Sequence, residues 1–299
     1  MTTDEHAERF THLRPLLFTI VYEILGSATE ADDVLQESYL RWAEVDLATV
    51  RDTKSYLARL ATRQALNARR AVARRREDYV GPWLPEPLLL EHASGPDADV
   101  VLAESVSMAM LVVLETLGPD ERAVFVLHEV FGFDYAEIAG AVGKSAVTVR
   151  QVAHRAREHV HARRKRYEPA GSAVTSRVIA QFMTAATTGD LTGLLAVLAP
   201  SVTWTADGGG KASAARRPVV GAEKTAALVL GLFQQMERVP DARLEWTVCN
   251  GAPAVIARRG ELLEAVFLVE IIDGAITHFY AIRNPDKLAA IAAPRTITR

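Results

Sequence analysis

Arginine side chains recur along one face of a predicted helix over residues 55–76. At 100° per residue, these arginines, an asparagine and an aromatic side chain fall within an arc of about 80°. The members of this arginine stripe are Tyr56, Arg59, Arg63, Asn67, Arg70 and Arg74. The stripe lacks acidic partners at i,i+4 spacing, so it suits phosphates, while its aromatic and amide groups suit exposed bases. The pattern favours nucleic-acid contact over the alternative, a solvated charged face.

A second basic stretch predicts two helices joined by a tight turn over residues 135–160. Gly143 permits the turn, Ser145 is a good N-cap, and Val142 and Val149 belong to the faces expected to be buried. In a helix-turn-helix, the N-terminal half of the second helix enters the major groove, where arginine pairs with guanine and glutamine with adenine. The side chains placed to contact DNA are Lys144, Val147, Thr148, Arg150, Gln151, His154 and Arg155. A helical hairpin that binds no DNA is the alternative.

The predicted helix over residues 30–44 carries a third polar face. Its apolar positions include Val34, Leu35 and Trp42, which predict a buried side. The opposite side is formed by Asp33, Gln36, Glu37 and Arg41. Spacing alone assigns no partner to this face.

Candidates for enzyme chemistry lie in the last third of the chain. They are Asp190, Asp207, His278 and Tyr280, with Trp204 as a possible wall of an apolar pocket. Carboxylates and histidine can act as bases in such a pocket, but each residue also fits a structural role. The run Gly208–Lys211 lacks the spacing of a P-loop. We therefore expect no enzyme activity, no catalytic residue, no metal site and no cofactor.

The elements that position these residues change character along the chain. Apolar spacing is helical up to about residue 166, and proline- and glycine-rich breaks occur at 77–99 and 169–172. The last third has two helical stretches followed by strand-like runs separated by Asn-Gly, Arg-Gly and Asp-Gly. The stretches are Val174–Thr188, Lys224–Gln235, Leu244–Cys249, Ala254–Arg258, Leu262–Ile272 and Ala275–Ile282. This order predicts two helical modules and an α+β domain with an antiparallel meander.

The formal charge of −3 conceals strong blocks of opposite sign. The net charge is −7 for residues 1–50, +8 for 51–76, −12 for 77–141, +6 for 142–168 and +2 for the remainder. Near-neutrality therefore does not exclude DNA binding. The single cysteine, Cys249, excludes an internal disulfide, and the acidic start and lack of a long apolar run predict a cytoplasmic protein without membrane contact.

Residues 6–165 resemble an extracytoplasmic-function (ECF) sigma factor, the minimal type with two sigma modules. The run Glu30–Glu37 resembles the helix that grips the core polymerase clamp, which implies that the polar face formed by Asp33, Gln36, Glu37 and Arg41 binds core polymerase. Asp52–Asn67 resembles the segment that melts and reads the −10 element. Leu117–Arg122 and the helix-turn-helix resemble the module that reads the −35 element.

Three further strings resemble signatures of ECF sigma factors with a fused SnoaL-like C-terminal domain. They are Trp83, Leu84, Pro85, Glu86 and Pro87; Asp207, Gly208, Gly209, Gly210 and Lys211; and Asn284, Pro285, Asp286 and Lys287. The resemblance implies a cone-shaped α+β fold that regulates the sigma modules in cis. We expect the three strings to meet and hold the domains in place.

The resulting prediction is a multi-domain protein with two all-α sigma modules and a C-terminal α+β SnoaL-like cone with a curved antiparallel sheet. Residues 1–78 would be sigma region 2, 79–99 a linker, 100–168 region 4 and 172–293 the regulatory domain. The expected partners are core RNA polymerase and promoter DNA, with a possible small-molecule ligand of the cone, and the free protein is expected to be monomeric. The alternative function is a stand-alone helix-turn-helix regulator with a ligand-binding cone.

Overall fold

The structure, a computed structural model, describes residues 2–91, 100–163, 171–291 and 293–299. These residues form two compact units. The helical unit contains the chain up to Asp78, the described residues between Leu90 and α8, and the C-terminal tail 293–299. The α+β unit contains Tyr79–Leu89 and residues 171–291. The segment between the two basic stretches therefore belongs in part to the α+β unit.

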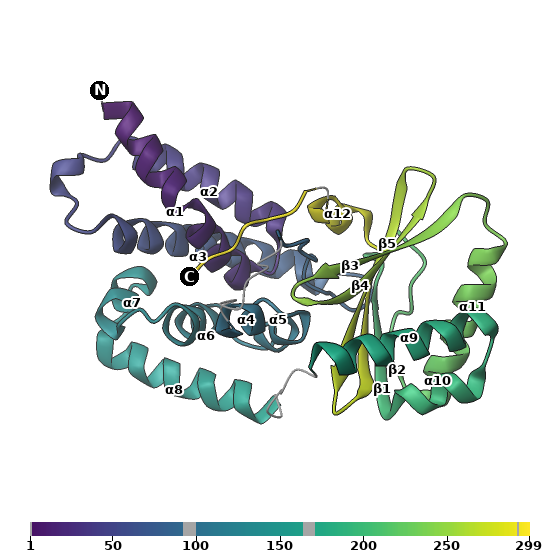
Figure 1. The fold of residues 1–299 in the computed structure, drawn as a ribbon. Helices are drawn as coiled ribbons and strands as arrows, with labels where there is room; N and C mark the ends of the chain where they lie inside the picture. The colour runs from purple at the N-terminus through teal and green to yellow at the C-terminus, as the bar shows by residue number, and fades with distance from the viewer. Residues whose placement is uncertain (1, 92–99, 164–170, 292) are drawn as a thin grey trace. The chain divides into compact units, whose positions relative to one another are not determined.

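Long helices form the first half of the helical unit (Figure 1). They are α1 (Thr2–Leu25), α2 (Ala28–Trp42) and α3 (Thr53–Glu77), with a 3-10 turn at Leu47–Thr49. Ser27 caps α2 by accepting a hydrogen bond from the Glu30 amide. The apolar side of α3 buries Leu57, Ala61 and Leu66, and α3 packs on α1 and α2. The predicted helices over 30–44 and 55–76 are confirmed.

The second half of the helical unit ends in the predicted helix-turn-helix. Its elements are α4 (Val100–Ser105), α5 (Met108–Leu114), α6 (Pro119–Phe125), the π-helical η2 (Val126–Val130), α7 (Tyr135–Val142) and α8 (Ala146–Arg163). Gly143 ends α7 with φ +70°, a left-handed conformation that glycine adopts without strain. Ser145 Oγ accepts a hydrogen bond from the Thr148 amide at 3.2 Å, which confirms the cap at the start of α8.

In the described part of the α+β unit, six strands form one sheet in the order β2-β1-β6-β5-β4-β3. The strands are β1 (Leu198–Asp207), β2 (Val219–Val220), β3 (Ala242–Cys249), β4 (Ala252–Arg259), β5 (Leu262–Ile272) and β6 (Ala275–Ile282). The antiparallel meander is confirmed for β3 to β6. Asn250-Gly251 and Asp273-Gly274 have positive φ at both positions, as the predicted hairpin turns require.

The sheet is mixed, because β1 pairs with β6 in parallel. This corrects the expectation of an antiparallel sheet throughout. The strand pattern of β1 was missed because Pro200 and Ser201 interrupt the alternation of apolar residues near its start. The β1–β6 pair places the ends of both strands, Asp207 and Ile282, next to each other.

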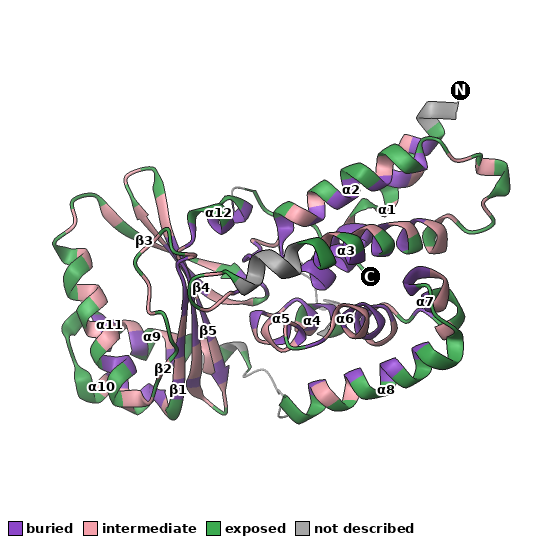
Figure 2. Ribbon diagram, turned by 180° about the vertical axis from the view of Figure 1, so that it is seen from behind, coloured by how far each residue is buried: buried purple, intermediate pink, exposed green. Residues whose placement is uncertain are grey.

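Helices α9 (Ser172–Thr188), α10 (Leu191–Val197) and α11 (Ala222–Glu237) contribute with the sheet to one apolar core. The Phe279 ring lies 5.4 Å from Phe182 and 5.1 Å from Trp204, measured between centroids. Figure 2 shows buried residues along the central strands and on the helices that pack against them. After β6 the chain forms α12 (Pro285–Leu288) and a 3-10 turn at Ala289–Ile291. Among the described residues, no helix is both long and apolar enough to cross a bilayer.

Candidate functional site

The arginine stripe lies on the face of α3 that points away from its apolar side. Its exposed members are Arg59, Arg63, Asn67 and Arg70. Tyr56 is half-buried, with its ring centroid 5.6 Å from that of Trp42, and the Arg59 guanidinium lies 5.3 Å from the Tyr56 centroid. Arg74 belongs to α3, but its side chain lies outside the described part of the structure. One aromatic and a row of cations are therefore brought together.

Two arginines of the stripe contact the second half of the helical unit. Arg63 donates a hydrogen bond to the Gly140 carbonyl on α7 at 2.8 Å. Arg70 forms an ion pair with Asp120 at 2.8 Å, and Lys144 reaches the same carboxylate at 3.1 Å. Ser55, near the start of α3, donates to Glu137 at 2.7 Å. The sequence pattern did not reveal these contacts, because their partners lie 50 to 82 residues away.

The predicted DNA-contacting side of α8 is exposed. Its members are Val147, Thr148, Arg150, Gln151, His154 and Arg155, with Lys144 just before the helix. Val147 is 71% exposed, unusual for an aliphatic side chain, and Arg150 lies over the Tyr135 ring at 5.3 Å. Val149, Val152 and the rest of the inward stripe are buried. The outward side chains thus have the placement that major-groove contact needs.

The polar face of α2 is also open. Asp33, Gln36, Glu37 and Arg41 are all exposed, and Arg41 pairs with Glu37 at 2.8 Å on the same helix. Leu40 lies beside them in sequence and is 61% exposed. A single exposed leucine is common on protein surfaces and does not by itself assign a partner to this face.

The three signature strings meet inside the α+β unit, around Asp207. This carboxylate is fully buried at the end of β1. Its Oδ1 accepts a hydrogen bond from Tyr79 Oη at 2.5 Å, and its Oδ2 accepts from the Leu84 amide at 2.8 Å. Lys287 Nζ completes the site with an ion pair to Oδ2 at 2.6 Å. We call the residues Tyr79, Trp83, Leu84, Asp207, Asn284 and Lys287 the motif cluster.

Lys287 and Asn284 bind the linker as well as Asp207. Lys287 Nζ also donates to the Leu84 carbonyl and lies 3.8 Å from the Trp83 ring centroid, a cation–π contact. Asn284 donates from Nδ2 to Tyr79 Oη at 2.8 Å. Burial together with hydrogen bonding to Asp207 raises the pKa of the Tyr79 hydroxyl, so it stays protonated as a donor. Hydrogen bonds and an aromatic face thus surround the Asp207–Lys287 ion pair.

The remaining signature residues lie beside the cluster. A Cβ at Gly209 would lie 2.9 Å from Tyr79 Oη and closer still to Asn284, so this close approach requires glycine. Lys211 pairs with Asp286 at 2.5 Å in an exposed position. Pro85, Glu86 and Pro87 are buried, and Leu88 next to them exchanges hydrogen bonds with Asn250.

The candidates for enzyme chemistry do not converge. Asp190 caps α10 by accepting from the Gly193 amide at 3.0 Å, which is the structural role expected of it. Asp207 belongs to the motif cluster. His278 and Tyr280 lie on β6 on the side opposite Phe279, and both contact Glu270, at 2.9 and 3.3 Å. His278 and Tyr280 thus meet at Glu270, outside the lining of the cavity described below, while Asp190 and Asp207 lie in other places.

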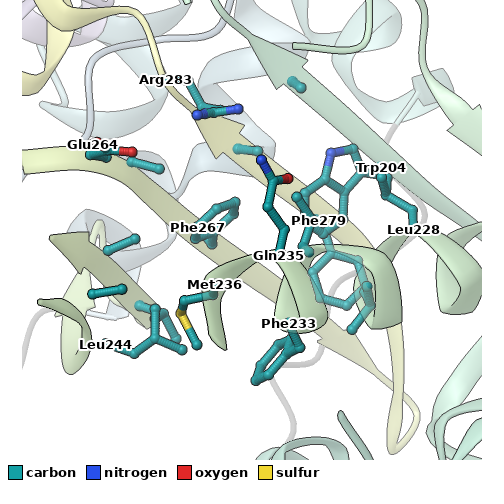
Figure 3. A pocket seen from close by; sticks show the side chains of 18 of the residues that line it. Trp204, Leu228, Phe233, Gln235, Met236, Leu244, Glu264, Phe267, Phe279 and Arg283 are labelled. Atoms are coloured by element: carbon teal, nitrogen blue, oxygen red, sulfur yellow. The ribbon is translucent and has the colours of Figure 1, made fainter. Parts of the chain in front are cut away.

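A cavity of about 340 Å³ lies between the helices and the sheet of the α+β unit (Figure 3). Its walls are mainly apolar and include Trp204, Phe267 and Phe279. The described lining contains no histidine, aspartate, tyrosine or cysteine, and its one carboxylate, Glu264, pairs with Arg259 at 2.8 Å. Such a cavity is suited to binding a small molecule and lacks a free base for proton abstraction.

Comparisons with known proteins identify the two halves of the helical unit. Residues 9–76 match the family Sigma-70 region 2, and residues 107–160 match Sigma-70, region 4. The chain is 35% identical to the ECF RNA polymerase sigma factor SigJ of Mycobacterium tuberculosis (strain ATCC 25618 / H37Rv), across 93% of this chain and 91% of SigJ. This chain belongs to the ECF family of RNA polymerase sigma factors.

Two further similarities extend over the whole sigma factor. The probable ECF RNA polymerase sigma factor SigI of M. tuberculosis (strain CDC 1551 / Oshkosh) is 32% identical, across 94% of this chain and 93% of SigI. The crystal structure of M. tuberculosis SigJ matches with a TM-score of 0.76 at 31% identity and covers 96% of this chain and 99% of that one. The predicted fold class and an alternative sigma factor, rather than an enzyme, are confirmed.

A buried polar network joins region 2 to region 4 of the sigma factor. Arg122 of α6 is fully buried; it donates to the Glu23 carbonyl at 2.5 Å and pairs with Glu115. Arg69 of α3, also buried, pairs with Glu115 at 3.4 Å, and Ser105 donates to the Glu23 carboxyl at 2.6 Å. Burial raises the pKa of Glu23 to about 8, although the Ser105 hydrogen bond and the charge of Arg122 act to lower it. Sequence reasoning missed this junction because arginine is normally a surface residue.

The C-terminal tail of the sigma factor packs on region 2. Arg295 pairs with Asp32 of α2 at 2.6 Å, and its guanidinium lies 5.2 Å from the Phe18 ring centroid. The backbone of Arg295 accepts a hydrogen bond from the Glu91 amide at 3.0 Å. Asp32 is adjacent in sequence to Asp33, so the tail lies next to the polar face of α2.

Proposed function

We propose that this sigma factor directs core RNA polymerase to promoters under the control of its own SnoaL-like domain. The exposed face of α2 would bind core polymerase, the arginine stripe of α3 would contact the −10 element and the outward side of α8 would contact the −35 element. Exposure of these faces and the family's two regions support the assignment. Work on RNA polymerase would place the protein in the cytoplasm.

The motif cluster carries the proposal of regulation in cis. The chain that links region 2 to region 4 is held at Tyr79, Trp83 and Leu84 by the buried Asp207 and Lys287 of the SnoaL-like domain. A buried ion pair that also satisfies backbone groups fixes this segment in one arrangement. A change in the SnoaL-like domain at Asp207 or Lys287 would therefore change the freedom of the two sigma regions.

Run-off transcription with core polymerase tests this role on full-length protein. Asp207→Asn removes the charge that Lys287 neutralises and turns an acceptor into an amide facing the Leu84 N–H, so we expect release of residues 79–89 and a severalfold change in transcript yield. Asp286→Asn is the matched control, because its ion pair is exposed and contributes little. Hydrogen exchange of the linker measures its release. Equal transcript yields from both variants would contradict regulation through the cluster.

We further propose that the cavity of the SnoaL-like domain takes a small-molecule ligand. Its size is at the lower end of the range for small-molecule sites, and its walls are apolar with a few polar groups. Binding of such a molecule would give the domain a signal to respond to.

A further inference from the structure

The cavity of the SnoaL-like domain carries an excess of positive charge. Four arginines and one glutamate belong to its described lining: Arg243, Arg258, Arg259, Arg283 and Glu264. Glu264 neutralises Arg259, and Glu245 at the outside pairs with Arg243 and Arg258 at 3.0 and 3.1 Å. Arg283 takes part in none of the ion pairs found among the described residues, and its guanidinium donates to the Ser213 carbonyl. One lining cation thus has unused charge.

A second polar group of the cavity also lacks a partner. Trp204 is 6% exposed, and no hydrogen bond from its indole N–H to another described residue is formed. In Figure 3 the indole nitrogen, the Gln235 amide and the Arg283 guanidinium are drawn along one side of the cavity, and Phe233 and Met236 along the other. The indole N–H of this lining residue is therefore available to a hydrogen-bond acceptor inside the cavity.

The apolar part of the cavity favours rings. The Trp204 ring centroid lies 5.7 Å from Phe267 and 5.1 Å from Phe279, with the planes tilted by 48° and 32°. Aromatic walls at such distances gain from offset or edge contacts with another ring, beyond the area that they bury. An anionic group on the same molecule would meet Arg283, and a charge-assisted hydrogen bond there is stronger than a neutral one.

We propose that this cavity binds an aromatic molecule with one anionic group, held by Arg283 and by the Trp204 indole N–H. This inference rests on the proposed ligand-binding role of the domain and names the chemical class of the ligand. Arg283 is suited to this task because it directly follows β6 and lines the cavity together with Phe279 and Ala281 of that strand.

The site is joined to the motif cluster through the same strand ends. The Arg283 amide donates to the Asp207 carbonyl at 2.7 Å, and Asn284, the next residue, binds Tyr79. Ser213, the acceptor of the Arg283 guanidinium, follows the Asp207–Lys211 string in the same loop. A ligand that draws Arg283 away from Ser213 would therefore act on the residues that hold the linker, and the two binding events would be coupled reciprocally.

Two fluorescent probes of nearly the same shape test the charge requirement on full-length protein. Anilinonaphthalene sulfonate carries an anionic group, and N-phenylnaphthylamine is its neutral counterpart. We expect wild-type protein to bind the anionic probe more tightly than the neutral one. Arg283→Gln should lower the affinity for the anionic probe about tenfold and leave the affinity for the neutral probe unchanged. Arg177→Gln on α9 is the matched control, because Arg177 is exposed and not part of the lining.

Trp204→Phe keeps an aromatic ring and removes the N–H, so it should lower the affinity for the anionic probe about threefold. Its melting temperature should show that the variant remains folded. Equal affinity of the two probes for wild-type protein, or equal loss in the Arg283 and Arg177 variants, would overturn the assignment. Asp207→Asn measures the coupling: an unchanged affinity for the anionic probe would remove the link to the motif cluster. Transcription by Asp207→Asn is a separate readout, so failure of regulation and failure of the ligand site are distinguishable.

Discussion

The two basic faces of the helical unit share a sequence pattern and differ in their surroundings. On α8 the outward side chains are exposed, and Arg150 lies over the ring of Tyr135, a residue of the same region. On α3 the arginine stripe is partly occupied, since Arg63 and Arg70 bind Gly140 and Asp120 of region 4. Charge and periodicity therefore identify both faces, but only the structure separates an open face from an occupied one.

The difference has a consequence for promoter binding. In the proposed function α8 is free to meet duplex DNA, whereas α3 must exchange intramolecular partners for phosphates or bases. The contacts that hold α3 are of two kinds: a buried junction around Arg122 and exposed ion pairs such as Arg70–Asp120. Loss of one partner costs far more free energy in a buried charged pair than in an exposed one. The junction therefore determines how stably α3 is bound to region 4, and the exposed pairs determine how readily DNA reaches the arginine stripe.

The largest effect is expected at the junction. Arg122→Met removes a fully buried cation that pairs with the Glu115 carboxylate, which should cost about 3–5 kcal/mol in the free energy of unfolding. Urea unfolding followed by the helical signal in circular dichroism measures this loss. Arg70→Gln, which breaks an exposed pair of the same two regions, should cost about 1 kcal/mol or less. Similar losses in both variants would mean that the distinction between junction and surface is wrong.

The junction should also make stability depend on pH. The raised pKa of Glu23, about 8 against an ordinary 4.5, means that the folded chain keeps this proton while the unfolded chain loses it above pH 4.5. Folding is then penalised increasingly as pH rises from about 4.5 to 8. Glu23→Gln removes this penalty, so its stability advantage over wild type should grow between pH 5 and pH 8. Thermal melts at both values check the trend, and a constant difference would show that Glu23 is ionised in the fold.

A third prediction separates the two basic faces by their function. Arg150→Gln should weaken binding to duplex −35 DNA by about 1–3 kcal/mol, in free protein and in polymerase holoenzyme alike, because this face is open in both. Arg63→Gln should weaken −10 binding in holoenzyme and have little effect in free protein, where Arg63 already binds Gly140. Fluorescence anisotropy with the two DNA elements measures each case. A large effect of Arg63→Gln on free protein would mean that α3 is as open as α8.

The faces and turns were predictable because they obey local rules. The arginine stripe follows from helical periodicity, and Gly143 and Ser145 follow from the backbone and cap that a tight turn requires. The meeting of the three signature strings was also expected, although only the structure shows that Asp207 is the buried centre with Lys287 as its counter-ion.

Features that depend on distant partners were not predictable. Arg69 and Arg122 look like surface cations in sequence, and they are buried because carbonyls and carboxylates from other helices receive them. Pro200 interrupts the apolar alternation of β1, so the sequence pattern does not predict this strand. Its parallel pairing with β6 could not be predicted for the same reason. Arg283 directly follows β6, and the alternation of that strand predicts that its side chain lies on the same side as Phe279, so the sequence does contain a signal for this residue.

The smallest expected effect tests the exposed pairs that cover α3. Hydrogen bonds from Lys144 and Arg70 keep the pKa of Asp120 below its ordinary range against the opposing effect of burial, so the pair is ionised throughout the neutral range. Asp120→Asn frees Arg70 and should raise the affinity of free protein for a single-stranded −10 oligonucleotide about two- to threefold, the gain that an exposed pair allows. Glu129→Gln is the matched control, because it breaks the Arg157 pair of region 4 without touching α3. Equal affinities of the two variants would show that Asp120 does not restrict the stripe, and the occupied state of α3 would then rest on Gly140 and the buried junction alone.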